Sequence, residues 1–437
     1  MSDQQSPDMK TLDAAIQLAV DVLVSDLVKS AEPAALQELA LSGLADGFAV
    51  KWQDVPSYRD LAMLLTHDSR IRALLKPSNA EAPVLYSYLI GTPMWVMKAP
   101  AGLLASSCFD LLVADEPMTH EALVMALLAN IQRLRLIGSG EDVDCAFVVG
   151  LDGFALPPGA RLDTNLGLIR ESGVLGNAMA FFGGKAASVL AGRFAMRIRI
   201  VQPGEIPDEQ AALENLERVR RSVLIVRLAI ILADSNVGEP LRPMPALHVV
   251  TAPYMGFMGG TTIPQLDRPR ITRPAPLTET EMSAVATWIG VLSARPVNNV
   301  NIALERIVTA STERITNEDI LIDSVMAWEN LVGTDGESTF RVTASLSRLL
   351  EANPTYRRKR HHELRKVYNV RSRVVHGEPA SASAVHNSAV KALDIAKQAV
   401  SVIVTQEPWL LELPSSTERA DAILLGYPPG LRADQLD

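Results

Sequence analysis

An arginine and a histidine in the stretch "RKVYNVRSRVVHGEP", residues 365–379, have side chains suited to chemistry on a phosphodiester. Arg371 is permanently cationic and can bind a phosphate or the negative charge that builds on phosphorus during reaction. His376 has a side chain that can carry a proton near neutral pH. RNA supplies its own nucleophile, the 2′-hydroxyl, so such a pair can in principle cleave it without a metal ion. The two residues therefore predict a site for RNA.

Arg371 falls on a helical stripe that otherwise reads as apolar. The stripe comprises Leu364, Val367, Tyr368, Arg371, Val374 and Val375. A guanidinium in such a position needs a carboxylate, a phosphate or an opening to solvent. The upstream helix has Glu329 in an equivalent place, on a stripe with Ile322, Val325, Met326 and Val332. A structural ion pair between Arg371 and Glu329 and an anion-binding arginine both fit this pattern.

His376 lies five residues after Arg371, about 140° around and roughly 7.5 Å along an ideal helix. The two side chains would therefore not share a helix face. A common site requires a long reach from Arg371, a loosened helix before Gly377, or a second copy of the segment facing the first. His376 also suits a simple role as a cation beside a helix C-terminus.

The cations of the chain are concentrated around this pair. The formal net charge is −9, yet residues 355–376 hold eight Lys or Arg against the single acid Glu363, which makes the segment +7 and leaves −16 elsewhere. Such a strip can hold a polyanion locally on an acidic protein, although a solvated helix face has the same composition. The residues predicted to bind RNA are Arg357, Arg358, Lys359, Arg360, Arg365, Lys366 and Arg373.

The elements that must position these residues are predicted to be helices in a C-terminal bundle at 276–414. Thr316 and Asp319 have the spacing of a helix cap, and Gly333 and Gly377 follow the ends of two predicted helices. Short links between successive helices favour antiparallel packing. A polar tail at 415–437, with a short helical middle, completes the chain.

Two other regions are predicted upstream of the bundle. Residues 1–78 have helical periodicity and form an N-terminal helical layer, with helices expected at 11–31, 32–45 and 57–76. Residues 79–275 form a mixed α+β domain, with helices at 118–137 and 207–235. Its short apolar runs predict strands at 84–90, 93–99, 108–114, 144–156, 193–204 and 246–260. The predicted fold class is therefore a multidomain α+β protein that ends in an all-α bundle.

Composition excludes several classes of protein. The longest apolar run, at 222–233, is interrupted by Arg227 and is too short to span a membrane, and the polar N-terminus favours a cytoplasmic protein. The two cysteines, Cys108 and Cys145, are too few for a disulfide framework and are expected as buried thiols. The glycine-rich stretch at 181–188 has Met179 and Ala186 where a phosphate-binding loop needs other residues. No metal ion or cofactor is predicted.

Three segments together resemble the Apea-like branch of the HEPN (higher eukaryotes and prokaryotes nucleotide-binding) superfamily. They are "LIDSVMAWENLV", "STFRVTASLSRLLEA" and "YNVRSRVVHG", in that order, and the likeness spans roughly residues 300–405. The superfamily spacing of arginine and histidine also occurs at Arg357 with His362 and at Arg242 with His248. Arg371 and His376 alone lie within "Y-x-x-R-S-x-x-V-H-G", which is a more specific arrangement.

The resemblance implies a dimerising four- or five-helix bundle and a metal-independent endoribonuclease, as found in phage-defence and toxin systems. It implies that Arg371 clamps the phosphate, that His376 is the general acid or base, and that Ser372 is a polar helper. Glu329 matches the family's helix acid and is expected to orient Arg371, while Tyr368 would stack on a base or, more simply, pack in the core.

Inactive relatives in the superfamily imply an alternative. The bundle would then be a non-catalytic module for dimerisation or nucleotide binding. In either case the α+β region is expected to sense a trigger, recognise a protein or phage component, or restrain the bundle.

Overall fold

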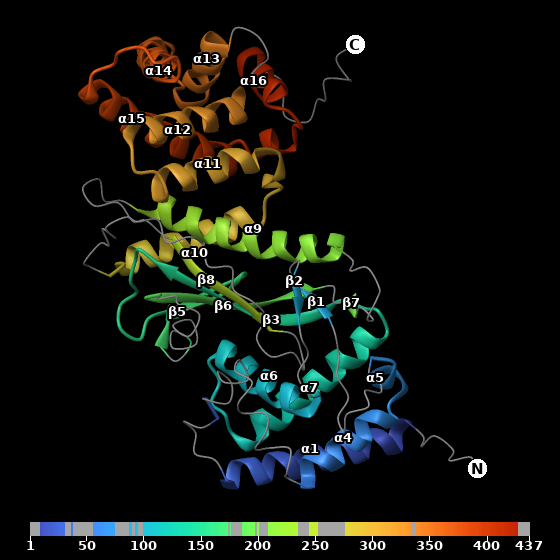
Figure 1. Cartoon of the computed structure of the whole chain (residues 1–437). Helices are drawn as coiled ribbons and strands as arrows, with labels where there is room; N and C mark the ends of the chain where they lie inside the picture. The colour runs from blue at the N-terminus through green and yellow to red at the C-terminus, as the bar shows by residue number, and fades with distance from the viewer. Residues whose placement is uncertain are drawn as a thin grey trace, which may run out of the picture. The chain divides into compact units, whose positions relative to one another are not determined.

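The computed structural model of the chain describes two compact units, and neither is continuous in sequence (Figure 1). The first comprises Met1–Asp152, Pro158–Arg221 and Pro245–Pro264, and the second comprises Gly153–Pro157, Ser222–Met244 and Gln265–Asp437. The sequence patterns did not indicate this division. The residues described are 9–30, 36–37, 56–74, 87–89, 92–94, 99–173, 175, 186–196, 199–200, 209–234, 244–251, 276–333 and 338–426.

The first unit combines helices with antiparallel strands. Its larger sheet has the strand order β4-β5-β6-β3-β8, and a smaller one has the order β2-β1-β7. Helices α6 and α7 pack against β3 on one side of the larger sheet (Figure 1). The helices are α1 (Met9–Ser30), α4 (Pro56–His67), α5 (Ser69–Leu74), α6 (Ala99–Ala114) and α7 (His120–Gly138). The strands are β1 (Ser87–Leu89), β2 (Thr92–Met94), β3 (Val143–Asp152), β4 (Arg161–Thr164), β5 (Gly167–Glu171), β6 (Ser188–Met196), β7 (Arg199–Ile200) and β8 (Met244–Thr251).

The core of this sheet is centred on β3. All of its residues except Asp144 and Asp152 are buried; the strand lies between β6 and β8, and α6 and α7 pack against it. Antiparallel pairing with β6 places Phe147 opposite Gly192, where a side chain would meet the Phe147 ring at 2.8 Å. The described strands β4, β5, β6 and β3 form a continuous antiparallel set.

The second unit is a bundle of helices around α12. This helix contacts α11, α13, α14, α15 and α16, and its fully buried Trp328 donates a 3.0 Å hydrogen bond from Nε1 to the Ala392 carbonyl. The unit also contains α9 (Glu209–Ala233) from Ser222 onward. The helices are α10 (Glu279–Ser293), α11 (Asn301–Thr312), α12 (Asn317–Val332), α13 (Ser338–Leu350), α14 (Pro354–Val375), α15 (Ala382–Thr405) and α16 (Ser416–Leu425), with short 3-10 turns η1 (Val297–Val300) and η2 (Pro408–Glu412).

The predicted fold class is confirmed: an α+β region precedes a C-terminal run of packed helices. The predicted cap of α12 is also present, since the Thr316 hydroxyl accepts a 3.1 Å hydrogen bond from the Asp319 amide. The strand predicted at 108–114 is wrong, because this run is the end of α6. Of the predicted helix at 32–45, only residues 36–37 are described. Residues 254–260 and most of the glycine-rich stretch at 181–188 also lie outside the described residues.

Two further features complete the fold. No helix in the described part of the chain has the length and apolar character needed to cross a membrane. Helix α16 (Ser416–Leu425) lies in the polar tail, whose middle was predicted to be helical, and it packs on α12 and α13.

Candidate functional site

Helices α12 and α14 bring Glu329, Tyr368 and Arg371 together in the second unit. The Tyr368 hydroxyl donates a 2.6 Å hydrogen bond to Oε1 of Glu329. The other carboxylate oxygen, Oε2, lies 3.6 Å from Nη2 of Arg371. The Arg371 guanidinium carbon also lies 6.0 Å from the centroid of the Tyr368 ring. One carboxylate thus holds a tyrosine tightly and an arginine loosely.

Arg371 lies where the buried stripe of α14 ends. Leu364, Val367 and Tyr368 are buried, whereas the Arg371 side chain is 21% exposed and Val375 is 47% exposed. The predicted core position of Val375 is therefore wrong, and Val370 is buried instead. Since Val375 and His376 are both exposed, the last turn of α14 leaves the core of the bundle.

The charge of Arg371 is only partly matched by its surroundings. A charge-assisted hydrogen bond between an arginine and a carboxylate measures about 2.7–2.9 Å, shorter than the 3.6 Å separation from Glu329. The Nε atom of Arg371 is buried and has no hydrogen-bond partner. A guanidinium keeps its charge in such a place, so it can still attract an anion.

His376 ends α14 as an exposed residue. Its backbone N–H donates a 3.0 Å hydrogen bond to the Ser372 carbonyl, so the helix keeps its geometry up to this point. The loosening considered from the sequence does not occur, and Gly377 then turns the chain with φ +70°. No hydrogen bond, ion pair or ring contact in the described chain joins His376 to Arg371. Within one chain, the predicted pair does not converge.

The predicted basic strip divides into free and engaged cations. Arg358, Lys359, Arg365, Lys366 and Arg373 are exposed. The Arg357 guanidinium instead donates hydrogen bonds of 3.0 and 2.8 Å to the carbonyls of Glu351 and Ala352, which follow α13. Arg360 lies 3.8 Å from Glu363. Arg357 therefore stabilises the helix junction.

Sequence reasoning missed a buried arginine, Arg419, which is 1% exposed. It donates hydrogen bonds of 2.8 Å to the carbonyls of Asn330, Leu331 and Leu413, and one of 3.3 Å to that of Asn299. Burial lowers the pKa of Arg419 to about 10, which leaves it charged at neutral pH. The signal in the sequence is that Arg419 shares a helical stripe with Ala422 and Ile423.

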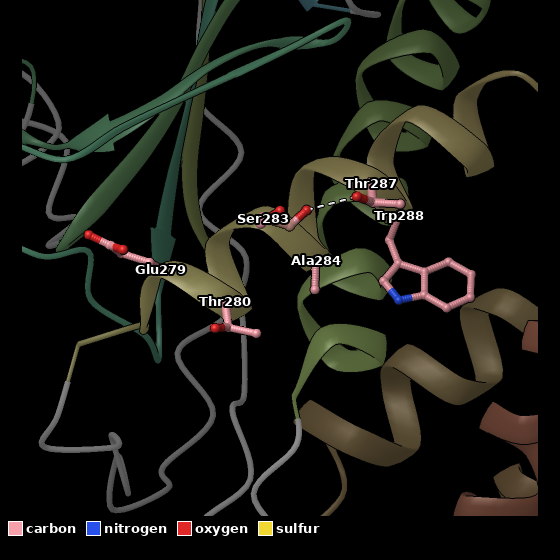
Figure 2. Close-up of a pocket in the computed structure, with 6 residues that line it drawn as sticks. All are labelled: Glu279, Thr280, Ser283, Ala284, Thr287 and Trp288. Carbon is pink, nitrogen blue, oxygen red and sulfur yellow. Dashed lines mark hydrogen bonds between the residues drawn. The ribbon is translucent and has the colours of Figure 1, made fainter.

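A shallow pocket of about 770 Å³ lies along α10, on a different helix from Arg371 and His376 (Figure 2). The Thr287 hydroxyl donates a 2.9 Å hydrogen bond to the Ser283 carbonyl, and the Trp288 ring lies at the other end from Glu279. None of the described lining residues is cationic, so the pocket does not suit a phosphodiester. Its described lining consists of Glu279, Thr280, Ser283, Ala284, Thr287 and Trp288.

Other reactive groups in the described chain do not form a site. Cys108 and Cys145 are buried free thiols, and burial raises the pKa of Cys108 to about 12 and also raises that of Cys145. Among the described residues, no three His, Cys, Asp or Glu side chains are arranged to hold a metal ion.

No protein-family model, no curated protein and no solved structure matches the chain. The resemblance to the Apea-like HEPN branch therefore remains an expectation from the sequence.

Proposed function

We propose that the protein is a metal-independent endoribonuclease of the HEPN type. The observation that carries the proposal is the state of Arg371, a partly exposed guanidinium that its neighbouring carboxylate approaches no closer than 3.6 Å. Such a cation can accept a phosphate without first breaking a tight ion pair. The resemblance of "YNVRSRVVHG" to the Apea-like motif gives the reaction class.

In the proposed enzyme, Arg371 stabilises the charge that develops on phosphorus, and His376 transfers the proton at the attacking or leaving oxygen. Glu329 positions Arg371, Tyr368 fixes Glu329 through its hydroxyl, and Ser372 remains a polar helper. The two principal residues occupy different faces of α14, so we propose a homodimer through the C-terminal bundle, in which a second copy completes the site.

The remaining parts of the proposal concern the setting of this reaction. We place the protein in the cytoplasm and assign RNA as its substrate. The α+β unit would respond to a protein or a phage-derived trigger, as in a phage-defence or toxin-like system.

The test is cleavage of RNA by the purified full-length protein in the presence of EDTA. We expect Arg371→Ala and His376→Ala each to reduce cleavage at least 100-fold, on the order of the usual contribution of a catalytic acid, base or charge stabiliser. His386→Ala is the matched control, because His386 is an exposed histidine on the neighbouring helix α15. Circular dichroism and size-exclusion chromatography would check fold and dimer.

Wild-type activity in either variant would contradict the assignment. Binding of RNA without cleavage by the wild-type protein would instead favour a non-catalytic HEPN module. The loose pair between Arg371 and Glu329 fits that alternative less well, since a purely structural ion pair is more stable at hydrogen-bonding distance.

A further inference from the structure

The outer face of α14 is a continuous cationic surface. Eight exposed residues between Arg358 and His376 fall within about 120° of the helix circumference, over a length of about 27 Å. The one acid of this stretch, Glu363, lies outside this arc and 3.8 Å from Arg360, with its side chain 41% exposed. The members of this cationic face are Arg358, Lys359, His362, Arg365, Lys366, Asn369, Arg373 and His376.

An exposed aromatic ring from the neighbouring helix borders this surface. Phe340 of α13 is 57% exposed, and its ring meets that of His361 edge to face, with centroids 5.5 Å apart and an angle of 84°. Helices α13 and α14 lie side by side (Figure 1), and His361 adjoins the cationic face one helical turn before Arg365. Phe340 is therefore held at the edge of the face and still open to solvent.

His361, which contacts this ring, contributes packing and little charge. Burial lowers the pKa of His361, and the positive charge of the neighbouring Arg365 lowers it further. His361 is therefore neutral at pH 7, and it can support an uncharged aromatic surface. The positive charge beside Phe340 comes from the arginines and lysines of the cationic face.

We propose that this surface binds single-stranded RNA, with phosphates along the outer face of α14 and a base stacked on Phe340. Cations in a row with an exposed aromatic ring are the combination that sequence-tolerant single-strand binders use. A duplex would present its phosphates but keep its base faces stacked inside. The choice of RNA rests on the proposed function, whereas the preference for a single strand rests on Phe340 and the cationic face.

The experiment measures binding of a fluorescein-labelled 2′-O-methyl oligoribonucleotide to the full-length protein by anisotropy. This probe lacks the free 2′-hydroxyl, so binding is observed whether or not the protein cleaves RNA. Phe340→Leu keeps an apolar side chain without a ring face, and we expect it to weaken binding about tenfold, whereas Phe340→Trp preserves binding. Val390→Ala, at a 53% exposed position on α15, is the matched control.

Two comparisons separate stacking from charge alone. Annealing the complementary strand should weaken binding to the wild type, and polyphosphate, which has no bases to stack, should bind the wild type and Phe340→Leu with equal affinity. Replacing Arg365 and Lys366 with glutamine should reduce the slope of log affinity against log salt by about 1.4, at roughly 0.7 per cation on a single strand.

Equal affinity of wild type and Phe340→Leu, or equal affinity for single strand and duplex, would overturn the inference. These outcomes are distinct from a failure of the proposed function. A protein that binds the probe through Phe340 but leaves unmodified RNA intact would retain this surface and lose only the nuclease assignment.

Discussion

Glu329 interacts with two neighbours, closely with Tyr368 and at a longer distance with Arg371, and this difference decides whether Arg371 is available to bind an anion. The 2.6 Å hydrogen bond from Tyr368 fixes the carboxylate, while the 3.6 Å separation from Arg371 leaves the guanidinium available. A carboxylate held in this way orients the arginine electrostatically without neutralising it at close range. Glu329 is therefore a positioning residue in the proposed site.

Glu329→Gln tests this role, because it removes the charge and retains an oxygen that can accept from Tyr368. We expect kcat for RNA cleavage to fall about tenfold with KM unchanged, since the loss affects charge stabilisation in the transition state more than substrate binding. Glu318→Gln, an exposed change on the same helix, is the control. A rise in KM alone would show that Glu329 affects only binding.

Arg419 leads to a prediction about stability. Its guanidinium pairs with four backbone carbonyls, two of which, Asn330 and Leu331, belong to the last turn of α12. Arg419→Met would leave these acceptors buried and unpaired, so we expect a loss of about 3 kcal/mol or more in the free energy of unfolding. Thermal unfolding followed by circular dichroism measures it. Arg373→Met, at an exposed position, should change stability by about 0.5 kcal/mol at most.

The residues of the site were only partly predictable. The stripe pattern led from the sequence to Arg371, Glu329 and Tyr368, and the structure places all three together. The engagement of Arg357 with Glu351 and the burial of Arg419 were not predictable, because each depends on where a helix end lies in space. A sequence pattern predicts which face of a helix a residue occupies. It does not predict which residues of other elements contact the end of that helix.

At the scale of elements, two glycines end helices for different reasons. Gly333 follows α12 with an extended backbone, and a Cβ there would lie 2.2 Å from the Glu329 carbonyl oxygen. Gly377 follows α14 in the left-handed region, with φ +70° and open space around it. The first glycine is required by close packing and the second by backbone conformation.

Gly333→Ala and Gly377→Ala should therefore differ. We expect Gly333→Ala to cost about 1–3 kcal/mol through overpacking and to displace the end of α12, which carries Glu329. Gly377→Ala should cost about 1 kcal/mol, and Gly377→Asn should recover much of that loss because asparagine tolerates the left-handed region. Thermal unfolding of the three variants would contradict this explanation if Gly377→Asn were no more stable than Gly377→Ala.

Helices with clear start and stop signals were predicted well, whereas the short apolar run at 108–114 was not. Thr316 and Gly333 mark the two ends of α12 as expected. The run at 108–114 forms the end of α6. Its apolar pattern extends back to Leu103 without Gly or Pro, and a short apolar run alone cannot separate a strand from a buried helix. The hairpin of β4 and β5 was missed because its strands are short and largely polar.

At the scale of the whole molecule, the second unit includes a helix that lies far upstream in the sequence. Arg227 on α9 donates hydrogen bonds of 2.6 Å to the Thr312 hydroxyl and 2.8 Å to Glu313 at the end of α11. Asp234, directly after α9, attracts Lys397 on α15, although burial still lowers the pKa of that lysine. The predicted bounds of the bundle, 276–414, therefore leave out the part of α9 that belongs to this unit.

Two fragments test this composition. A fragment of residues 276–437 lacks α9, so we expect it to aggregate or to unfold at a lower temperature, because Thr312, Glu313 and Lys397 lose their partners. A second fragment, in which a Gly/Ser linker joins residues 222–244 to 265–437, restores them and should unfold cooperatively at a higher temperature. Circular dichroism melts and size-exclusion chromatography compare the two. Equal stability would mean that α9 contributes little to the bundle, and that the bundle from 276 onward folds on its own.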